Sequence, residues 1–272
     1  MGWATDSAIE AFKASLDWKR LWLPYIAIGI LSFAVSIITM IITMGMPPFL
    51  PPLIGAMPFG IAIYLLVMAF YGTFITGISL NIAFDYFKKG RFSFHAAIKK
   101  TLPRFLTLLG LSILIGFLFL VLVAIIVSSF PIAFSMSYSS PQGIIISMLM
   151  AIALMIAFTI VILLAMPFLF ILAPVALFEK RGVFASFGRV IELGKESYLQ
   201  NLGFVLMFIL LEFVAYIAFM IVMLIFMLLA FVLIGIPLLI ISVVAFIGWA
   251  QAYQSLALAK FYQAKISTRK RR

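Results

Sequence analysis

The distribution of charge constrains this chain more than any other feature. No Asp, Glu, Lys, Arg or His occurs from Leu21 to Phe84 or from Phe105 to Phe178, and the stretch from Ser197 to Ala259 contains only Glu212. Each stretch is about three times as long as the ~20 apolar residues that one membrane-spanning helix needs. Each therefore has room for two spans and a turn, which predicts an all-α integral membrane protein with six transmembrane helices arranged as three hairpins.

The composition favours helices in a bilayer. Hydrophobic residues make up 66% of the chain and charged residues 10%, whereas a soluble domain carries ~25% charged residues. Membrane β-strands would alternate apolar and polar residues, but runs such as Phe213 to Ile234 are apolar on every side. The expected spans are residues 21–45, 58–88, 104–128, 144–178, 200–231 and 237–262, with tips at 44–58 and 128–143, and with Pro167 and Pro174 bending the fourth span.

The basic residues predict the orientation. All 19 Lys and Arg residues lie before, between or after the three hairpins, and the hairpin tips have none. Because Lys and Arg mark the cytoplasmic side, we expect a multi-pass protein of the cell membrane with both termini and both long connectors in the cytoplasm. The net charge of +11 follows from this topology and does not require a nucleic-acid partner. The expected partners are anionic lipid headgroups at the cytoplasmic face.

A short amphipathic stretch precedes each hairpin. Residues 11–16, 97–102 and 186–191 share a small residue, a bulky apolar residue and then a base. We expect three cytoplasmic interfacial helices, the first with Phe12 and Leu16 on the membrane surface and with its start at the capping-box pair Ser7 and Glu10. The chain is then one six-span domain, residues 1–272, with a possible pseudo-threefold repeat of approximately 7–88, 93–178 and 183–262.

Two groups of polar residues are candidate sites. Glu212 lies inside an apolar span, where insertion of a charged carboxylate costs ~2.5 kcal/mol or more, so we expect a neutral acid bonded to hydroxyls or amides of other spans or to Tyr216, one turn away. It is either a packing contact or a proton or cation site. Asn81 and Asp85 form a second cluster near the end of span two, where Asp85 is placed to pair with Lys88 and Lys89.

Signatures of catalysis are missing from the sequence. The absence of cysteine excludes disulfides and thiolate metal sites, and a single histidine, His95, cannot form a metal site alone. The chain contains no glycine-rich phosphate loop, HExxH or GxSxG motif. We therefore expect no catalytic residues, no metal and no cofactor.

One segment resembles a known group of proteins. Pro174, Glu179, Gly182 and the following amphipathic stretch with Ser186, together with residues 81–102, resemble prokaryotic six-span proteins. This group includes the membrane domain attached to some glycerophosphoryl diester phosphodiesterases and many uncharacterised archaeal membrane proteins. Val190 departs from its pattern, in which a small hydroxyl residue is common. The resemblance implies an integral membrane domain without catalytic residues, and the chain has no phosphodiesterase domain.

These observations lead to two main functional hypotheses, and an intramembrane enzyme with scattered ligands is a third. The first is a non-enzymatic membrane protein that binds or organises membrane lipid or supports partner proteins, based on the interfacial helices and the basic cytoplasmic face. The alternative is a small-solute or proton-coupled carrier or channel that uses Glu212.

Overall fold

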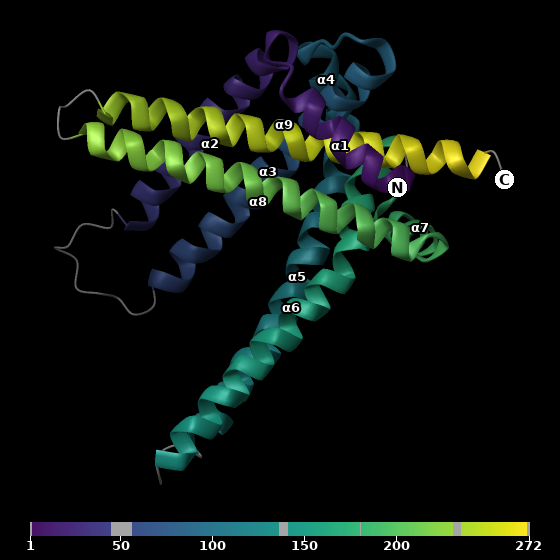
Figure 1. The fold of residues 1–272 in the computed structure, drawn as a ribbon. Coiled ribbons are helices and arrows are strands. Elements are labelled where there is room, and N and C mark those ends of the chain that lie inside the picture. The colour runs from purple at the N-terminus through teal and green to yellow at the C-terminus, as the bar shows by residue number, and fades with distance from the viewer. Residues whose placement is uncertain (1, 45–55, 136–140, 180, 231–234, 271–272) are drawn as a thin grey trace.

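The computed structural model in Figure 1 is built from helices. It describes residues 2–44, 56–135, 141–179, 181–230 and 235–270. Every regular element in these ranges is a helix, which confirms the all-α prediction for the described residues. The elements are α1 (Trp3–Ser15), α2 (Trp18–Met44), α3 (Ala56–Lys89), α4 (Phe94–Thr101), the 3-10 turn η1 (Leu102–Arg104), α5 (Phe105–Ser135), α6 (Pro141–Phe178), α7 (Val183–Glu196), α8 (Tyr198–Ala230) and α9 (Gly235–Lys270).

Four helical segments among the described residues are long and apolar enough to cross a membrane. They are Phe94–Val121, Met148–Phe178, Tyr198–Leu229 and Gly235–Ser267, and α2 contributes a shorter apolar segment, Pro24–Ile38. No more than 17% of the most apolar part of any of the four is buried inside the molecule. Because so much apolar surface is unstable in water, these helices indicate a membrane protein.

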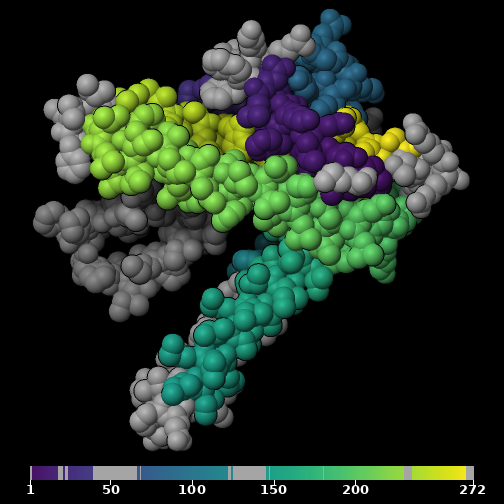
Figure 2. Space-filling view, in the orientation of Figure 1, coloured from purple at the N-terminus to yellow at the C-terminus, as the bar shows by residue number. Residues whose placement is uncertain are grey.

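The helices separate at one end of the molecule and converge at the other. The α5–α6 hairpin extends away from the remaining helices as a narrow rod, whereas α8 and α9 lie side by side (Figures 1 and 2). At the convergent end, the C-terminal ends of α3 and α6 meet α4, α7 and the C-terminal part of α9. We call this region the hub. Its core positions the polar groups described below.

Helices α2 and α9 pack through glycine. A Cβ atom on Gly29 would lie 2.7 Å from the Val244 carbonyl oxygen, and one on Gly248 would lie 2.6 Å from the Tyr25 carbonyl oxygen. Only residues without a side chain allow two helix backbones to approach this closely. Gly29 and Gly248 therefore serve the packing of α2 on α9.

Helix α1 differs from its prediction in two ways. It begins at Trp3, so Ser7 is not its cap; the Ser7 hydroxyl donates a hydrogen bond to the Trp3 carbonyl within the helix. The Phe12 ring packs edge-on against Tyr253 at 5.5 Å between centroids, while Leu16 is exposed. The expected membrane-facing stripe of Phe12 and Leu16 is therefore wrong, because the aromatic side of α9 offers Phe12 a protein partner.

The second hairpin is more continuous than its sequence predicts. Helix α5 continues to Ser135 and α6 begins at Pro141, so most of the expected tip at 128–143 is helical. Helix α6 continues without interruption through Pro167 and Pro174. A long helix can lose single hydrogen bonds at proline without ending. The expected first tip, 44–58, lies largely outside the described residues.

The three short stretches identified in the sequence have similar burial. Their small residues are fully buried, their bulky residues one position later are half-buried, and their last apolar residues are exposed. The three sets are Ala11, Phe12 and Leu16 in α1; Ala97, Ile98 and Leu102 in α4 and η1; and Ser186, Phe187 and Ile191 in α7.

Candidate functional site

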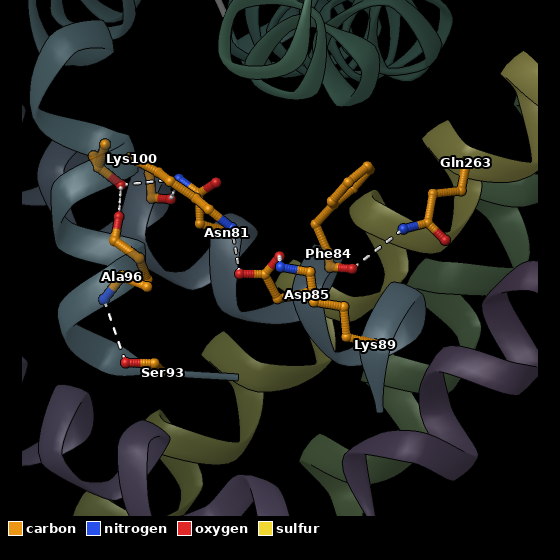
Figure 3. Close-up of polar contacts among 11 residues, drawn as sticks. Asn81, Phe84, Asp85, Lys89, Ser93, Ala96, Lys100 and Gln263 are labelled. Carbon is orange, nitrogen blue, oxygen red and sulfur yellow. Dashed lines mark hydrogen bonds and ion pairs between the residues drawn. The ribbon is translucent and has the colours of Figure 1, made fainter. Parts of the chain in front are cut away.

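Three aromatic rings form the centre of the hub. Phe84 near the end of α3 stacks on Phe178 at the end of α6, with 4.2 Å between ring centroids. Phe178 in turn lies 5.6 Å from the ring of Tyr262 on α9. Gln263, also on α9, donates a hydrogen bond to the Phe84 carbonyl oxygen (Figure 3). The C-terminal part of each hairpin's second helix is thus joined to the others by stacked rings.

A carboxylate follows the stacked ring on both α3 and α6. Asp85 accepts from the ammonium group of Lys100 on α4 at 2.5 Å (Figure 3). Glu179 accepts from the guanidinium of Arg189 on α7, with Nε 3.2 Å from Oε2. In both cases a helix end is tied to the next short helix by an acid–base pair. These contacts fix α4 and α7 against the hub.

Asn81 orients the first of these short helices. Its side-chain amide, buried one turn before Asp85, donates to the Thr101 hydroxyl at 3.0 Å and to the Gly77 carbonyl at 3.1 Å. Thr101 donates onward to the Ala97 carbonyl. A buried amide with its donors satisfied stabilises one arrangement of its neighbours. Asn81 therefore acts as a positioning residue between α3 and α4.

Glu179 is the most connected carboxylate of the hub. Its Oε2 also accepts from Arg181 Nε at 2.9 Å, and its Oε1 accepts from the Tyr262 hydroxyl at 3.2 Å. Burial lowers the pKa of Arg189, but hydrogen bonds and charge from Glu192 and Glu179 outweigh burial and raise that pKa above its ordinary value. Arg189 therefore remains charged, and this cluster is an ionic contact between the end of α6, α7 and α9.

The Asp85 side of the hub opens into a cavity of about 480 Å³. We call it the basic cavity. Gly90 follows the last residue of α3 and, with φ at 64°, ends the helix in the left-handed conformation that glycine tolerates best. The residues that line the basic cavity are the cations Lys88, Lys89, Lys100 and Arg104, the polar residues Asn81 and Asp85, and the apolar residues Phe84, Pro103, Leu177 and Phe178.

The charges of the basic cavity are unequal, because four cations line it with one carboxylate. Lys89 contacts Asp85 only distantly, at 3.9 Å, and the ammonium of Lys88 lies 5.9 Å from the centre of the Phe84 ring. Within the described part of the chain, neither Lys88 nor Arg104 forms an ion pair with a carboxylate. A concave site with excess positive charge and an apolar wall suits an anion attached to an apolar group.

The structure places the second candidate site elsewhere. Glu212 on α8 accepts a hydrogen bond from the Gln254 amide on α9, with 3.0 Å between Nε2 and Oε1. Tyr216 is 48% exposed and its ring lies beside Phe246 of α9. Glu212 does not line the basic cavity. It forms a polar contact between two antiparallel helices.

Sequence reasoning placed Asn81 and Asp85 together but missed their main partners. Asp85 was expected to pair with Lys88 and Lys89; its closest partner is Lys100, and Lys88 lies over the Phe84 ring instead. The amide that Glu212 was expected to find on another span is that of Gln254. The Glu179 cluster was not considered as a site. The acid–glycine pattern after α6 was a usable signal for it.

A family profile matches residues 82–264, from the hub end of α3 to the C-terminal part of α9. It describes DUF7544, a family of unknown function. The chain belongs to the DUF7544 family. The match includes Asp85, Lys100, Glu179, Arg189 and Tyr262, so most of the hub lies within the DUF7544 region. No curated protein and no solved structure matches the chain.

Proposed function

We propose that this protein is a non-enzymatic, six-span protein of the cell membrane that binds anionic phospholipid headgroups in the basic cavity of a cytoplasmic hub. The observation that carries the proposal is the lining of that cavity, with four cations, one carboxylate and an apolar wall. A phosphodiester is an anion with strong hydrogen-bond acceptors, and lysine and arginine are its usual ligands. The attached lipid would meet the apolar wall.

The location of the cavity supports a lipid as its ligand. It lies at the boundary between basic and apolar sequence. Lys88 and Lys89 follow the uncharged segment of α3, and Arg104 precedes the uncharged segment of α5. Lipid headgroups occupy this level in a bilayer.

The six-span topology has support from both chain ends. Helix α1 packs along the C-terminal part of α9, with Trp3 stacked on Phe261 at 5.5 Å, so the two terminal helices lie on the same side. Both α2 and α3 continue into uncharged sequence of sufficient length for a span. Basic residues at the hub favour its placement in the cytoplasm. The matching burial of the three short helices favours the threefold repeat.

The experiment compares lipids retained by the full-length protein. Native mass spectrometry measures phosphatidylglycerol and phosphatidylcholine bound to protein released from membranes. We expect preferential binding of phosphatidylglycerol. The double variant Lys88→Gln with Arg104→Gln should weaken it by roughly 30-fold, since the loss of each direct contact between a base of the cavity and the phosphate costs about 1 kcal/mol.

The matched control is Arg91→Gln with Lys99→Gln. Both residues are exposed, lie in the same connector and do not line the basic cavity, so the loss of charge is the same. This variant should bind phosphatidylglycerol nearly as well as the unmodified protein. Equal losses in the two double variants would contradict the proposal, because binding would then depend on net charge and not on the cavity.

The carrier alternative has less support. Its main residue, Glu212, is bonded to Gln254 and lies outside the basic cavity. A proton pathway needs a series of titratable groups, whereas Glu212 is the single charge between Ser197 and Ala259. The resemblance to membrane domains of glycerophosphoryl diester phosphodiesterases stays a prediction and carries no activity to this chain.

A further inference from the structure

A second cavity lies between α3, α5 and α6, and it shares α3 and α6 with the basic cavity. It has a volume of about 140 Å³, and we call it the apolar cavity. Its polar groups are few: the Thr73 hydroxyl donates to the Ser112 hydroxyl at 3.0 Å, and Thr76 adds a third hydroxyl. The lining residues are Gly72, Thr73 and Thr76 of α3, Leu108, Leu111, Ser112 and Ile115 of α5, and Leu169, Leu172 and Ala173 of α6.

The two cavities follow one line along the helices. On α3, Thr76 of the apolar cavity precedes Asn81 of the basic cavity by five positions, about 7.5 Å at a helical rise of 1.5 Å per residue. On α6, Ala173 precedes Leu177 by four positions, and Leu108 of α5 follows Arg104 of η1 by four. The apolar cavity therefore lies one to two turns deeper in the uncharged segments than the basic cavity.

We propose that the part of one acyl chain nearest the headgroup occupies the apolar cavity while the phosphate of the same anionic phospholipid occupies the basic cavity. This inference rests on the proposed function and names its ligand more closely: a double-chained anionic phospholipid and not a free phosphate compound. The positive charge of the basic cavity suits the phosphate, and the lining of the apolar cavity suits the acyl chain. The apolar cavity also lies deeper along the helices, as the acyl chain does in a bilayer.

The geometry of the hairpins gives the lipid a route. Helices α5 and α6 project away from α8 and α9 (Figure 1), and their apolar side chains Phe117, Leu118 and Met155 are at least half exposed. In a bilayer, lipid fills the space beside this hairpin. A phospholipid can thus enter from the side, without passing its chains through the hub.

The test fills the apolar cavity without changing the basic cavity. Gly72 lines the apolar cavity, and a Cβ atom there would meet nothing within 4 Å, so Gly72→Leu places a side chain in open space. The control is Gly116→Leu on α5, which is equally unobstructed and lines neither cavity. Each full-length variant is titrated with dioleoyl phosphatidylglycerol and, separately, with glycerol 3-phosphate.

We expect Gly72→Leu to bind dioleoyl phosphatidylglycerol about tenfold more weakly, because burial of methylene groups is lost. Its binding of glycerol 3-phosphate should be unchanged, and Gly116→Leu should behave like the unmodified protein. If Gly72→Leu changes neither ligand, the acyl-chain site is refuted although the headgroup site stands. If Lys88→Gln with Arg104→Gln also has no effect on either ligand, the proposed function itself fails.

A second measurement does not depend on a variant that folds. Phosphatidylglycerol with a photoreactive diazirine in one acyl chain is crosslinked to the unmodified protein, and the labelled peptides are identified. We expect labels at residues 72–76, 108–115 and 169–173. Labels confined to α8 and α9 would overturn the inference, and this result decides the matter if Gly72→Leu loses both ligands.

Discussion

At the scale of residues, Glu179 is the contact on which the hub depends most. Two guanidinium groups and one phenol converge on its carboxylate, from α7, from the connector before α7 and from α9. The side chains of Glu179 and Arg189 are only 15% and 13% exposed, so solvent cannot easily replace either partner. Removing one member of a shielded ionic cluster leaves the others without compensation.

We predict that Glu179→Gln lowers the free energy of unfolding by about 1–3 kcal/mol, the range for lost hydrogen bonds to charged groups. Glu192→Gln is the control, because Glu192 also binds Arg189 but is 51% exposed, and exposed pairs contribute about 0–1 kcal/mol. Thermal unfolding of both variants in detergent gives the comparison. Similar midpoints for the two variants would show that the Glu179 cluster has no special role.

At the scale of elements, the contact of α2 with α9 shows how these helices pack without polar side chains. Lipid tails are as apolar as leucine, so helices in a bilayer gain little from hydrophobic burial against each other. Close contact between backbones supplies dispersion energy instead, and Gly29 and Gly248 make that contact possible. The aromatic rings of Trp249 and Tyr253 extend the same interface toward Phe12 of α1.

We predict that Gly29→Ala or Gly248→Ala destabilises the protein by about 1–3 kcal/mol, because the added methyl group would overlap a backbone carbonyl. Gly203→Ala on α8 is the control, since the nearest atom to its Cβ is a Thr5 methyl group 4.0 Å away. Alanine favours helix over glycine by up to about 1 kcal/mol, so the control should be neutral or stabilised. Thermal unfolding gives the comparison. Equal unfolding temperatures for Gly29→Ala and Gly203→Ala would contradict the close contact of α2 with α9.

At the scale of the whole molecule, charge and apolar surface are separated along one direction. The described basic side chains gather around the hub, while the described side chains of α5, α6, α8 and α9 farther from it are apolar and mostly exposed. Helices α1 and α9 meet at the hub, so the first and last helices share one side of this gradient. A bilayer is the environment in which such a separation is stable.

The absence of native cysteine allows a direct test of topology. We predict that single cysteines replacing Asp6, Lys99, Lys195 or Ser267 are labelled by a membrane-impermeant maleimide only after cells are opened. Ser139→Cys, in the expected second tip and outside the described residues, should be labelled in intact cells. Labelling of Lys99→Cys and Lys195→Cys on opposite sides of the membrane would refute the six-span topology.

The sequence alone predicted the helices well, because an uncharged run of sufficient length is a local property. The predicted spans 21–45 and 58–88 compare with α2 at Trp18–Met44 and α3 at Ala56–Lys89. It also predicted that Asn81 and Asp85 share a polar cluster, since residues four apart lie on one side of a helix. The start of α1 and the extent of the second tip were wrong, because packing on α9 and helix continuation override local cap and turn signals.

The partners of these residues were decided by tertiary structure. Several bases lie close enough in the sequence to pair with Asp85. Lys100 is its nearest partner because the hydrogen bond from Asn81 to Thr101 holds α4 against α3. Glu212 meets Gln254 because α8 and α9 pack in one register. Composition and spacing determine which segments enter the bilayer, because the transfer of a segment out of water depends on that segment's own residues. Which side chains then meet depends on how the segments pack, and packing is a property of the whole chain.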